Sequence, residues 1–328
     1  MRMPAEWAAH ERTLMAWPCR AELWGQRLDR AEHDYATVAL AISEFEPVTM
    51  LARSSDAERA AQRCGPKVDV VEMPLDDSWV RDTGPIYVTA RGRRVVVDFT
   101  FNGWGNKFEP YADDAALVER WCERTGEERR VVEMVLEGGA IAVDGEGTLL
   151  TTEQCLLNPN RNPSMDRAEI ESVLADALGA DTVVWLPFGL DDRDTDGHVD
   201  TVACFTKPGT VLLQGCDHPG WRDYDRLAAT RRVLAAANDN AGRPIEIVDV
   251  PVLPLTEFDG ELYAVPYLNG YVVNGGVIVP VTGHPADGEM LAIITAAYPE
   301  RRIVPVPGAI LAYGGGGPHC ITQQVPRL

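Results

Sequence analysis

The residue with the clearest potential for covalent chemistry is Cys320. It follows a run of four glycines that starts at Gly314 and precedes the polar segment ITQQ. Backbone without Cβ atoms can approach a ligand closely. A cysteine attacks as its thiolate, so a cationic side chain or a bound cation must lower its pKa. We therefore predict that Cys320 is a nucleophile. The other six cysteines, at 19, 64, 122, 155, 204 and 216, are typical of small buried residues in a reducing compartment.

A histidine and a glutamate are the partners that such a nucleophile would need. His198 lies among carboxylates in the segment DTDGHVD and is suited to general acid–base work, a surface histidine in an acidic turn being the alternative. On an extended stretch, His198 and Asp200 would point to the same face. Glu137 follows an apolar run and precedes two glycines. It could hold the imidazole as the third member of a triad does, or it could be a solvated strand-end residue.

Asp82 and Trp79, in the segment WVRDTGP (79–85), complete the set. Asp82 could cap a turn, and Trp79 could belong to the core or to the wall of a site. Carboxylates and an aromatic ring together suit a planar guanidinium, which offers five hydrogen-bond donors and stacks on aromatic faces. A thiolate can displace an amine from its central carbon. The set therefore favours guanidine chemistry over acyl transfer, and the lack of metal-ligand spacing predicts that no metal is bound.

The elements that must position these residues follow an alternating α/β pattern. β-branched segments bounded by Pro or Gly predict strands, glycine-containing turns between apolar runs predict hairpins, and helical periodicity marks longer segments. The predicted strands are 47–53, 68–74, 129–136, 181–187, 245–251 and 301–307; the hairpins are 140–152, 202–214 and 267–281; the helices are 28–43, 112–125, 163–178, 222–238 and 286–298.

These elements recur as five ββαβ-like units without detectable sequence identity. An ordinary α/β sheet is the alternative interpretation. In four of the five units, however, unusual polar residues follow the same strand, at Asp82, Glu137, His198 and Cys320. Strand ends converge when strands are arranged around one axis. The pattern therefore predicts one active site at the centre of a pseudo-fivefold α/β ring.

Five segments resemble the signature blocks of the agmatine deiminase family, which also contains bacterial-type peptidylarginine deiminases. They are MPAEWAAHERTLMAWP (3–18), WVRDTGP (79–85), EGGAIAVDGEGTLL (137–150), TDGHVD (195–200) and GGGGPHCITQQ (314–324). The resemblance implies a pentein fold, a five-unit α/β propeller, as a single catalytic domain over residues 1–328. It also implies hydrolysis of a guanidine to a ureido group and ammonia without metal or cofactor, of the kind used in putrescine biosynthesis.

The resemblance also assigns a role to each matching residue. It makes Cys320 the nucleophile, His198 the general acid–base and Glu137 the carboxylate that orients this histidine. It places the guanidinium between Asp82 and Asp200. The predicted substrate-binding residues are Trp79, which lines the site, Asn269, Gly316 and Asp194, which would hold a distal amine.

Charge favours agmatine as the substrate, with N-carbamoylputrescine as the product. The predicted site is acidic, and a ligand with a cation at each end gains from that field, whereas an α-carboxylate is repelled. Free or peptidyl arginine, an amidinotransferase reaction and a non-catalytic guanidine-binding module are the alternatives. The acidic residues are Asp82, Glu137, Asp191, Asp192, Asp194, Asp196 and Asp200, and only Arg81 and Arg193 could receive a carboxylate there.

Composition is consistent with a folded enzyme of small molecules. The 328 residues are 45% hydrophobic and 24% charged, which is typical of a globular protein. Fifty acidic residues against thirty Lys and Arg give a net charge of −20, which disfavours a nucleic-acid partner. Because neither a signal-peptide core nor a membrane-spanning run is present, we predict a cytoplasmic protein with no membrane partner. The expected partner is a small cationic guanidino substrate, and homo-oligomerisation is left open.

Overall fold

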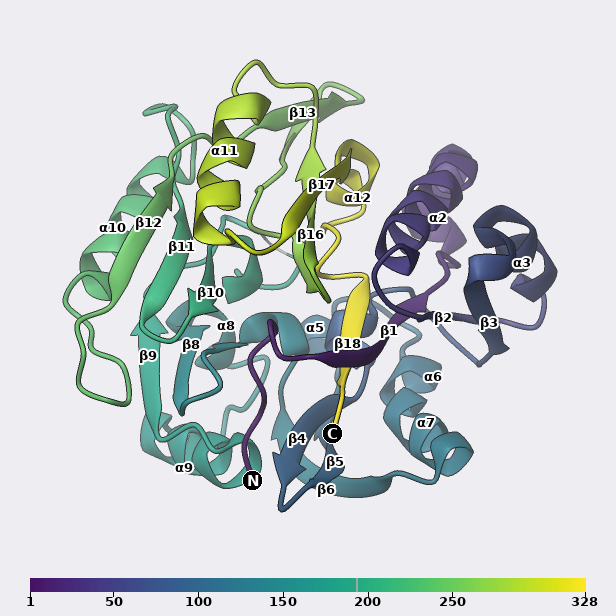
Figure 1. The fold of residues 1–328 in the computed structure, drawn as a ribbon, viewed down its shortest axis with the longest axis horizontal. Coiled ribbons are helices and arrows are strands. Elements are labelled where there is room, and N and C mark those ends of the chain that lie inside the picture. The colour runs from purple at the N-terminus through teal and green to yellow at the C-terminus, as the bar shows by residue number, and fades with distance from the viewer. Residues whose placement is uncertain (193) are drawn as a thin grey trace.

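The computed structural model shows a mixed α/β fold and describes residues 1–192 and 194–328. Arg193, one of the two arginines considered for carboxylate binding, lies outside the described residues. The described residues form six sheets, and the longer helices lie around them on the outside of the molecule (Figure 1).

One strand pattern recurs in four three-stranded sheets. In each, the first strand is antiparallel to the second, and the second is parallel to the third. The sheets are β4 (Ile86–Ala90), β5 (Arg93–Thr100) and β6 (Glu128–Val135); β7 (Ala142–Val143), β8 (Thr148–Thr152) and β9 (Thr182–Leu186); β10 (Ala203–Lys207), β11 (Thr210–Gln214) and β12 (Glu246–Val250); and β15 (Tyr271–Val273), β16 (Gly276–Val281) and β17 (Arg302–Pro307).

A four-stranded sheet joins the two ends of the chain. Its order is β18 (Thr322–Pro326), β1 (His10–Ala16), β2 (Val48–Ala52) and β3 (Val68–Glu72). The strand β1 is antiparallel to β18 and parallel to β2, which repeats the pattern of the other sheets. The pairing brings the C-terminal segment that carries Cys320 beside the N-terminal segment that carries Glu6 (Figure 1).

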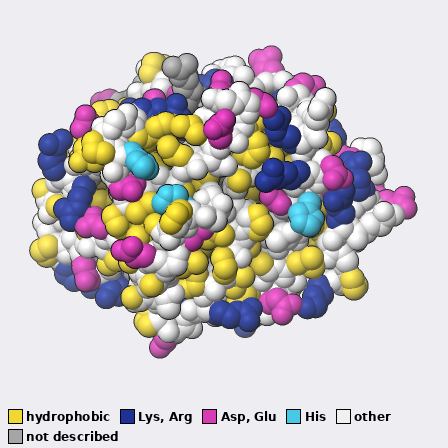
Figure 2. All heavy atoms as spheres, turned by 90° about the horizontal axis from the view of Figure 1, so that it is seen from above, with side chains coloured by type: hydrophobic (Ala, Val, Ile, Leu, Met, Phe, Trp, Pro, Cys, Tyr) yellow, Lys and Arg dark blue, Asp and Glu magenta, His cyan; other side chains and the backbone are white. Residues whose placement is uncertain are grey.

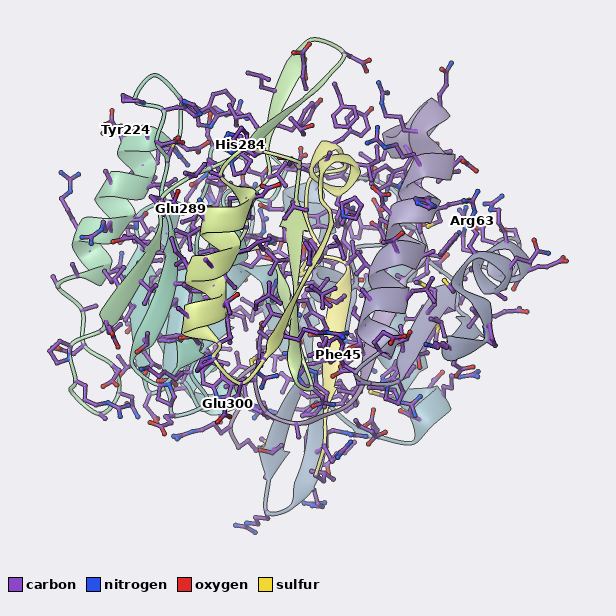
Figure 3. The ribbon with its side chains drawn as sticks, turned by 45° about the horizontal axis from the view of Figure 1, so that its top comes forward. Phe45, Arg63, Tyr224, His284, Glu289 and Glu300 are labelled. Atoms are coloured by element: carbon purple, nitrogen blue, oxygen red, sulfur yellow. The ribbon has the colours of Figure 1, made fainter. Side chains whose placement is uncertain are left out.

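Helices connect the parallel strand pairs, as parallel neighbours require a crossover. The short hairpin of β13 (Leu255–Phe258) and β14 (Glu261–Ala264) forms a separate sheet. The crossover helices are α2 (Leu28–Ser43), α3 (Ala57–Cys64), α7 (Leu117–Thr125), α9 (Arg167–Leu178), α10 (Tyr224–Leu234) and α11 (Asp287–Ala297). In Figure 3, Tyr224 marks α10, while His284 and Glu289 lie near the start of α11, on the outside of the sheets.

The predicted helices and strands are largely confirmed, with differences at helix ends. The helix expected over 163–178 begins at Arg167, because Asp166 and Glu169 form a capping box there. It ends at Leu178, as expected, and Gly179 after it adopts the left-handed conformation that glycine favours. The helix expected over 112–125 is two helices, α6 (Ala112–Ala115) and α7, separated at Ala116. The strands β1, β4, β5 and β18 and the β13–β14 hairpin were not predicted.

The surface seen in Figure 2 carries acidic and basic side chains interspersed, without one field of a single sign. Exposed pairs such as Arg231–Asp249 contribute to this mixture. Among the described residues, no helix combines the length and hydrophobicity that a bilayer crossing would need.

Candidate active site

Each of the five sheets with the recurring pattern is followed by a loop that reaches one common site. After the edge strand that runs parallel to its neighbour in each sheet, the chain supplies at least one of the predicted residues. The segment after β3 carries Asp82, in the short helix α4 (Val80–Thr83), and the segment after β6 carries Glu137. The segment after β9 carries His198 and Asp200, that after β12 carries Asn269 beyond the β13–β14 hairpin, and that after β17 carries Cys320. The sequence pattern predicted four of these contributions, and Asn269 supplies the fifth.

The Cys320 thiol lies buried between an amide and a carboxylate. Its Sγ is 3.2 Å from Asn269 Oδ1 and 3.5 Å from Asp200 Oδ2, so the thiol can donate to either. Burial raises the pKa of Cys320 well above its usual value, and the charges of Asp200 and Asp82 add to the rise. The free enzyme therefore holds a neutral thiol at neutral pH, and a cation must arrive beside it before a thiolate forms.

Two buried carboxylates, Asp82 and Asp200, face this sulfur from different loops. Asp82 accepts hydrogen bonds from the Trp104 indole (2.9 Å) and the Gly139 amide (2.9 Å). Burial raises its pKa; His198 acts in the opposite direction, and Asp200 adds to the rise. Asp200 Oδ2 accepts a hydrogen bond from His319 Nδ1 at 2.8 Å, whereas its Oδ1 is buried without a partner. Such an orphaned acceptor is costly and indicates the place of an absent donor.

His198 lies between two carboxylates at distances longer than hydrogen bonds. Its Nδ1 is 3.8 Å from Asp82 Oδ1, and its Nε2 is 3.8 Å from Glu137 Oε2. Although burial opposes it, Asp82, Cys155 and Glu137 raise the pKa of His198 well above its usual value. His198 is therefore an imidazolium, able to donate a proton. Catalytic hydrogen bonds often tighten only when substrate is bound.

A buried arginine fixes the glutamate behind this histidine. Arg161 Nε donates to Glu137 Oε1 at 2.6 Å, and both side chains are 0% exposed. Burial would raise the pKa of Glu137, but His198 and Arg161 lower it overall. The Arg161 guanidinium also contacts Asp196 Oδ2 at 2.8 Å. The carboxylate therefore stays ionised, with its Oε2 turned toward His198.

Gly139 marks the point at which the three charged groups converge. A Cβ atom on this residue would lie 2.6 Å from His198 Nδ1, 2.9 Å from Asp82 Oδ1 and 3.0 Å from Asp200 Oδ2. Real side chains essentially never approach so closely. The second glycine of the Glu137-Gly-Gly segment is therefore required by the packing of the site around it.

One set of metal-ligand side chains does come together in the site, although the sequence spacing did not indicate it. Glu137, Cys155 and His198 offer ligand atoms within 4.8 Å of one another. Two cations already occupy this neighbourhood, because Arg161 is bound to Glu137 and His198 is protonated. The charges thus favour an acid–base role for the group, and independence from metal stays a prediction.

The cavity in front of the thiol is narrow and partly aromatic. Trp79, Trp104, Asp82, Asp194 and Cys320 line it. At the glycine run, a Cβ on Gly316 would lie 2.7 Å from the Trp79 ring and 3.0 Å from Cys320 Sγ. The amide of Gly316 is bonded to the carbonyl of Leu311 at 3.0 Å. The absence of a side chain at Gly316 therefore leaves space beside Trp79 and Cys320, while its amide is not free to donate to a substrate.

Three aspartates of the loop 189–196 make different contacts. Asp194 lines the cavity, and burial, with Asp192 and Asp196, raises its pKa to about 6. Asp192 instead binds within its own loop, accepting from the amide of Asp194 at 2.8 Å. Asp196 forms an ion pair with Lys107 at 2.6 Å. Asp196 therefore adds less to the expected acidic field than its type suggests, because Lys107 and Arg161 offset its charge.

Two further expectations need correction. His198 and Asp200 do not lie on an extended stretch, because Val199–Thr201 forms a 3₁₀ turn; the two side chains meet at Gly139 instead. Arg81 does not line the cavity in front of the thiol, so it is not placed to receive a substrate carboxylate. It is buried and donates to Gln323 Oε1 at 2.7 Å and to the carbonyl of His319 at 3.3 Å.

Sequence reasoning missed three residues that shape the site, Trp104, Arg161 and His319. Trp104 has a φ of 53°, a conformation unusual for a side chain of its size. The flanking glycines in Asn102-Gly-Trp-Gly-Asn106 were the available signal for a strained turn. Arg161 had no such signal, because its partner Glu137 is 24 residues away in the chain.

Together, the fold and the site define a cysteine enzyme with a histidine and paired carboxylates suited to a guanidinium. Residues 2–326 match the family described as Porphyromonas-type peptidyl-arginine deiminase. Relatives that align over nearly the whole of both chains share more than 40% sequence identity with this protein. The chain belongs to this family.

The most similar relatives and structures include agmatine deiminases. The chain is 43% identical to the agmatine deiminase of Stutzerimonas stutzeri and 42% identical to that of Pseudomonas aeruginosa, each match covering 99% of this chain and 95% of the relative. The structure of Enterococcus faecalis agmatine deiminase superposes with a TM-score of 0.96 at 33% identity, covering 99% of this chain and 96% of that one. A substrate-bound agmatine deiminase of C. jejuni gives 0.91 at 28%, covering 99% and 96%.

Proposed function

We propose that this protein is a hydrolase that converts agmatine to N-carbamoylputrescine and ammonia through a covalent intermediate on Cys320. The observation that carries the proposal is the pair of buried carboxylates beside the thiol, one of which, Asp200, keeps an oxygen without a partner. A guanidinium supplies the donors that this acceptor lacks. The similarity to agmatine deiminases over the whole chain supports the same substrate.

The catalytic unit is residues 1–328, and its architecture is a pentein propeller of five units around one axis. Support comes from the five sheets that share one strand pattern and from the five loops that supply the site. The continuity of the β1–β18 pairing, which links the first and last segments of the chain, is consistent with a ring.

Binding of the guanidinium prepares the nucleophile. Asp82 and Asp200 accept its N–H groups, and the aromatic face of Trp79 borders the cavity. The cation arrives beside a thiol whose pKa burial has raised, and its positive charge stabilises the thiolate. The thiol proton is lost to solvent. Nucleophile activation is in this way coupled to the presence of substrate.

His198 then donates a proton in the first half of the reaction and accepts one in the second. The Cys320 thiolate attacks the central carbon, and His198 gives its proton to the departing nitrogen, which leaves as ammonia. An S-alkylthiouronium remains on Cys320. Neutral His198, held by Glu137, takes a proton from water as the hydroxyl adds to the carbon. The tetrahedral adduct then collapses: the C–S bond breaks, the Cys320 thiolate is regenerated, and the ureido product is released as the hydroxyl proton is lost.

The substrate tail explains the preference for agmatine. Asp194 lines the same cavity as Cys320 and receives the distal ammonium. Because the pKa of Asp194 is raised to about 6, its carboxylate is ionised at neutral pH and becomes protonated as the pH falls below that value. KM for agmatine should therefore rise below about pH 6. Arg81 does not line this cavity, so it offers nothing to the carboxylate of arginine.

The test compares agmatine, free arginine and a blocked arginyl peptide by the ammonia and ureido product that each yields without an added amine. Agmatine should have the highest kcat/KM, by more than ~10-fold or about 1.4 kcal/mol. Asp194→Asn should raise KM for agmatine, whereas Asp69→Asn, at an exposed position of β3, should leave it unchanged. A higher kcat/KM for arginine or the peptide would overturn the substrate assignment, and amidino transfer to an amine in place of ammonia release would identify an amidinotransferase.

A further inference from the structure

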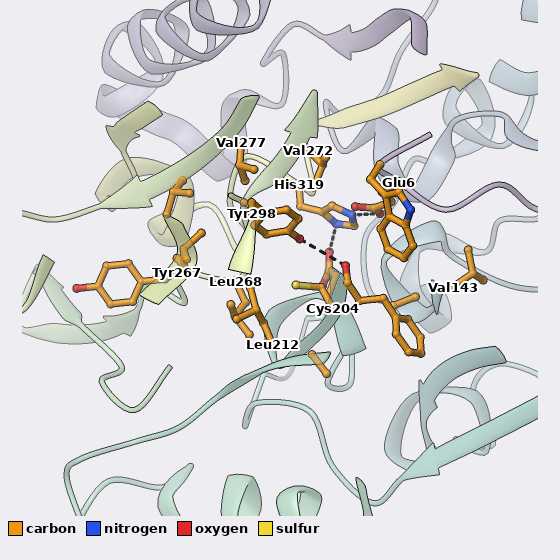
Figure 4. A pocket seen from close by; sticks show the side chains of 18 of the residues that line it. Glu6, Val143, Cys204, Leu212, Tyr267, Leu268, Val272, Val277, Tyr298 and His319 are labelled. Atoms are coloured by element: carbon orange, nitrogen blue, oxygen red, sulfur yellow. Dashed lines mark hydrogen bonds and ion pairs between the residues drawn. The ribbon is translucent and has the colours of Figure 1, made fainter. Parts of the chain in front are cut away.

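His319, the residue before Cys320, is held between two carboxylates from distant parts of the chain (Figure 4). Its Nδ1 is 2.8 Å from Asp200 Oδ2, and its Nε2 is 2.6 Å from Glu6 Oε1. The ring is buried beside an internal cavity lined mostly by apolar side chains, with Tyr298 and Cys204 nearby. Glu6, His319, Asp200 and the Cys320 thiol thus form one continuous chain of polar contacts.

The partners of His319 indicate its protonation state. An ionised carboxylate only accepts hydrogen bonds, and a histidine ring donates from both nitrogens only as the imidazolium. The charged groups that face the ring are Glu6, Asp200 and Arg81, with the Cys320 thiol beside Asp200. Burial and Arg81 lower the pKa of His319, but the two carboxylates raise it overall. The pKa of Glu6 is lowered to about 2, against the effect of its burial, chiefly by His319.

We infer that His319 is a positioning residue for the proposed reaction, an imidazolium that orients Asp200 and offsets its charge beside the Cys320 thiolate. This inference rests on the proposed function. The bond from His319 occupies Asp200 Oδ2 and leaves the unpartnered Oδ1 for the guanidinium. The same Oδ2 is the oxygen that lies 3.5 Å from the sulfur. His319 therefore reduces the repulsion that an uncompensated carboxylate would exert on the thiolate.

Glu6 is the group that keeps the proton on His319. Its substitution can therefore remove the charge of His319 while His319 still holds Asp200 in place. In Glu6→Gln, a neutral His319 can still donate from Nδ1 to Asp200, so the carboxylate keeps its place. KM for agmatine should change little. The thiol should ionise less readily, and an increase of one pKa unit lowers the thiolate population tenfold at a given pH below its pKa. We expect kcat to fall roughly tenfold, with the ascending limb of its pH profile moved to higher pH.

A second buried glutamate–histidine pair provides the matched control. Glu46 Oε1 is 2.9 Å from His10 Nδ1, and both side chains are buried. Glu46→Gln should lower thermal stability without moving the pH profile. An unmoved profile in Glu6→Gln, or an equal shift in Glu46→Gln, would show that the pair at His319 is only structural and overturn the inference.

A spectroscopic measurement tests the charge without any turnover. In protein labelled with ¹⁵N-histidine, both ring nitrogens of His319, assigned by their loss in His319→Asn, should show imidazolium shifts above neutral pH. One of them should become a neutral-type nitrogen in Glu6→Gln. A neutral ring in the unmodified protein would refute the inference even if agmatine is hydrolysed. Imidazolium shifts in a protein that releases no ammonia from agmatine would instead locate the failure in the proposed function.

Discussion

Gly139→Ala is expected to disable the site while leaving the fold largely intact. The added Cβ would stand 2.6 Å from His198 Nδ1, 2.9 Å from Asp82 Oδ1 and 3.0 Å from Asp200 Oδ2, so all three groups must move by about half an ångström to one ångström to regain ordinary contact distances of roughly 3.5 Å. The backbone of Gly139 does not lie in the left-handed region, so alanine adds no backbone strain there.

The magnitude follows from these distances. Inserting a methyl group into a packed region costs about 1–3 kcal/mol of stability. A misplacement of about 1 Å in a catalytic arrangement costs on the order of 10² in rate. We therefore expect kcat/KM for agmatine to fall by about 10²-fold or more, with a loss of unfolding free energy no larger than about 3 kcal/mol. Ammonia release and urea denaturation measure the two quantities.

Gly288→Ala is the matched control, because a Cβ there meets no atom within 4 Å, and the residue lies in α11. Alanine in a helix is favoured over glycine by about 1 kcal/mol, so this variant should be at least as stable as the original and fully active. If Gly139→Ala kept its full kcat/KM, the three groups would not be the ones that act on the substrate, and the reasoning from their convergence would be refuted.

Three further predictions concern the nucleophile, metal and the buried arginine. Cys320→Ser should lose at least ~10³ in turnover, measured as ammonia release, because a hydroxyl has no comparable anionic population; Cys64→Ser, at the buried last residue of α3, should stay active. Dialysis against a strong chelator should leave the rate unchanged, and a lost rate restored by a divalent ion would mean that His198 is a ligand. Arg161→Ala should cost about 3–5 kcal/mol in denaturant unfolding, because it leaves Glu137 buried without its cation; a loss below about 1 kcal/mol would contradict the pairing.

The fold could be predicted where local patterns decide the structure. Helix α2 occupies the residues that its periodicity indicated, and the third strand of each sheet was found from β-branched runs between Pro and Gly. The pairing of β1 with β18 could not be predicted, because it joins segments about 310 residues apart and no local signal specifies the partner. The same limit applies to the β13–β14 hairpin, whose residues are half-exposed and carry little apolar alternation.

The site residues were found where glycines and unusual polar residues stand together. Cys320, Glu137 and Gly316 lie in or next to such runs, and the structure brings them to one place. The roles of Arg161 and His319 depend on distant partners, since Arg161 acts through Glu137 and His319 joins Asp200 to Glu6. Charge compensation between segments far apart in the chain leaves no spacing pattern, so the pairing of Asp196 with Lys107 and Arg161 could not be predicted.

The central claim is that Cys320 carries the amidino carbon of agmatine during turnover. The most direct measurement is an acid quench of the enzyme while it turns over agmatine, followed by mass spectrometry of the peptide that contains Cys320. We expect an adduct on Cys320 with the mass of agmatine less that of ammonia, absent in Cys320→Ser and absent without substrate. Turnover with Cys320 unmodified at every quench time, or an adduct on another cysteine such as Cys155, would contradict it.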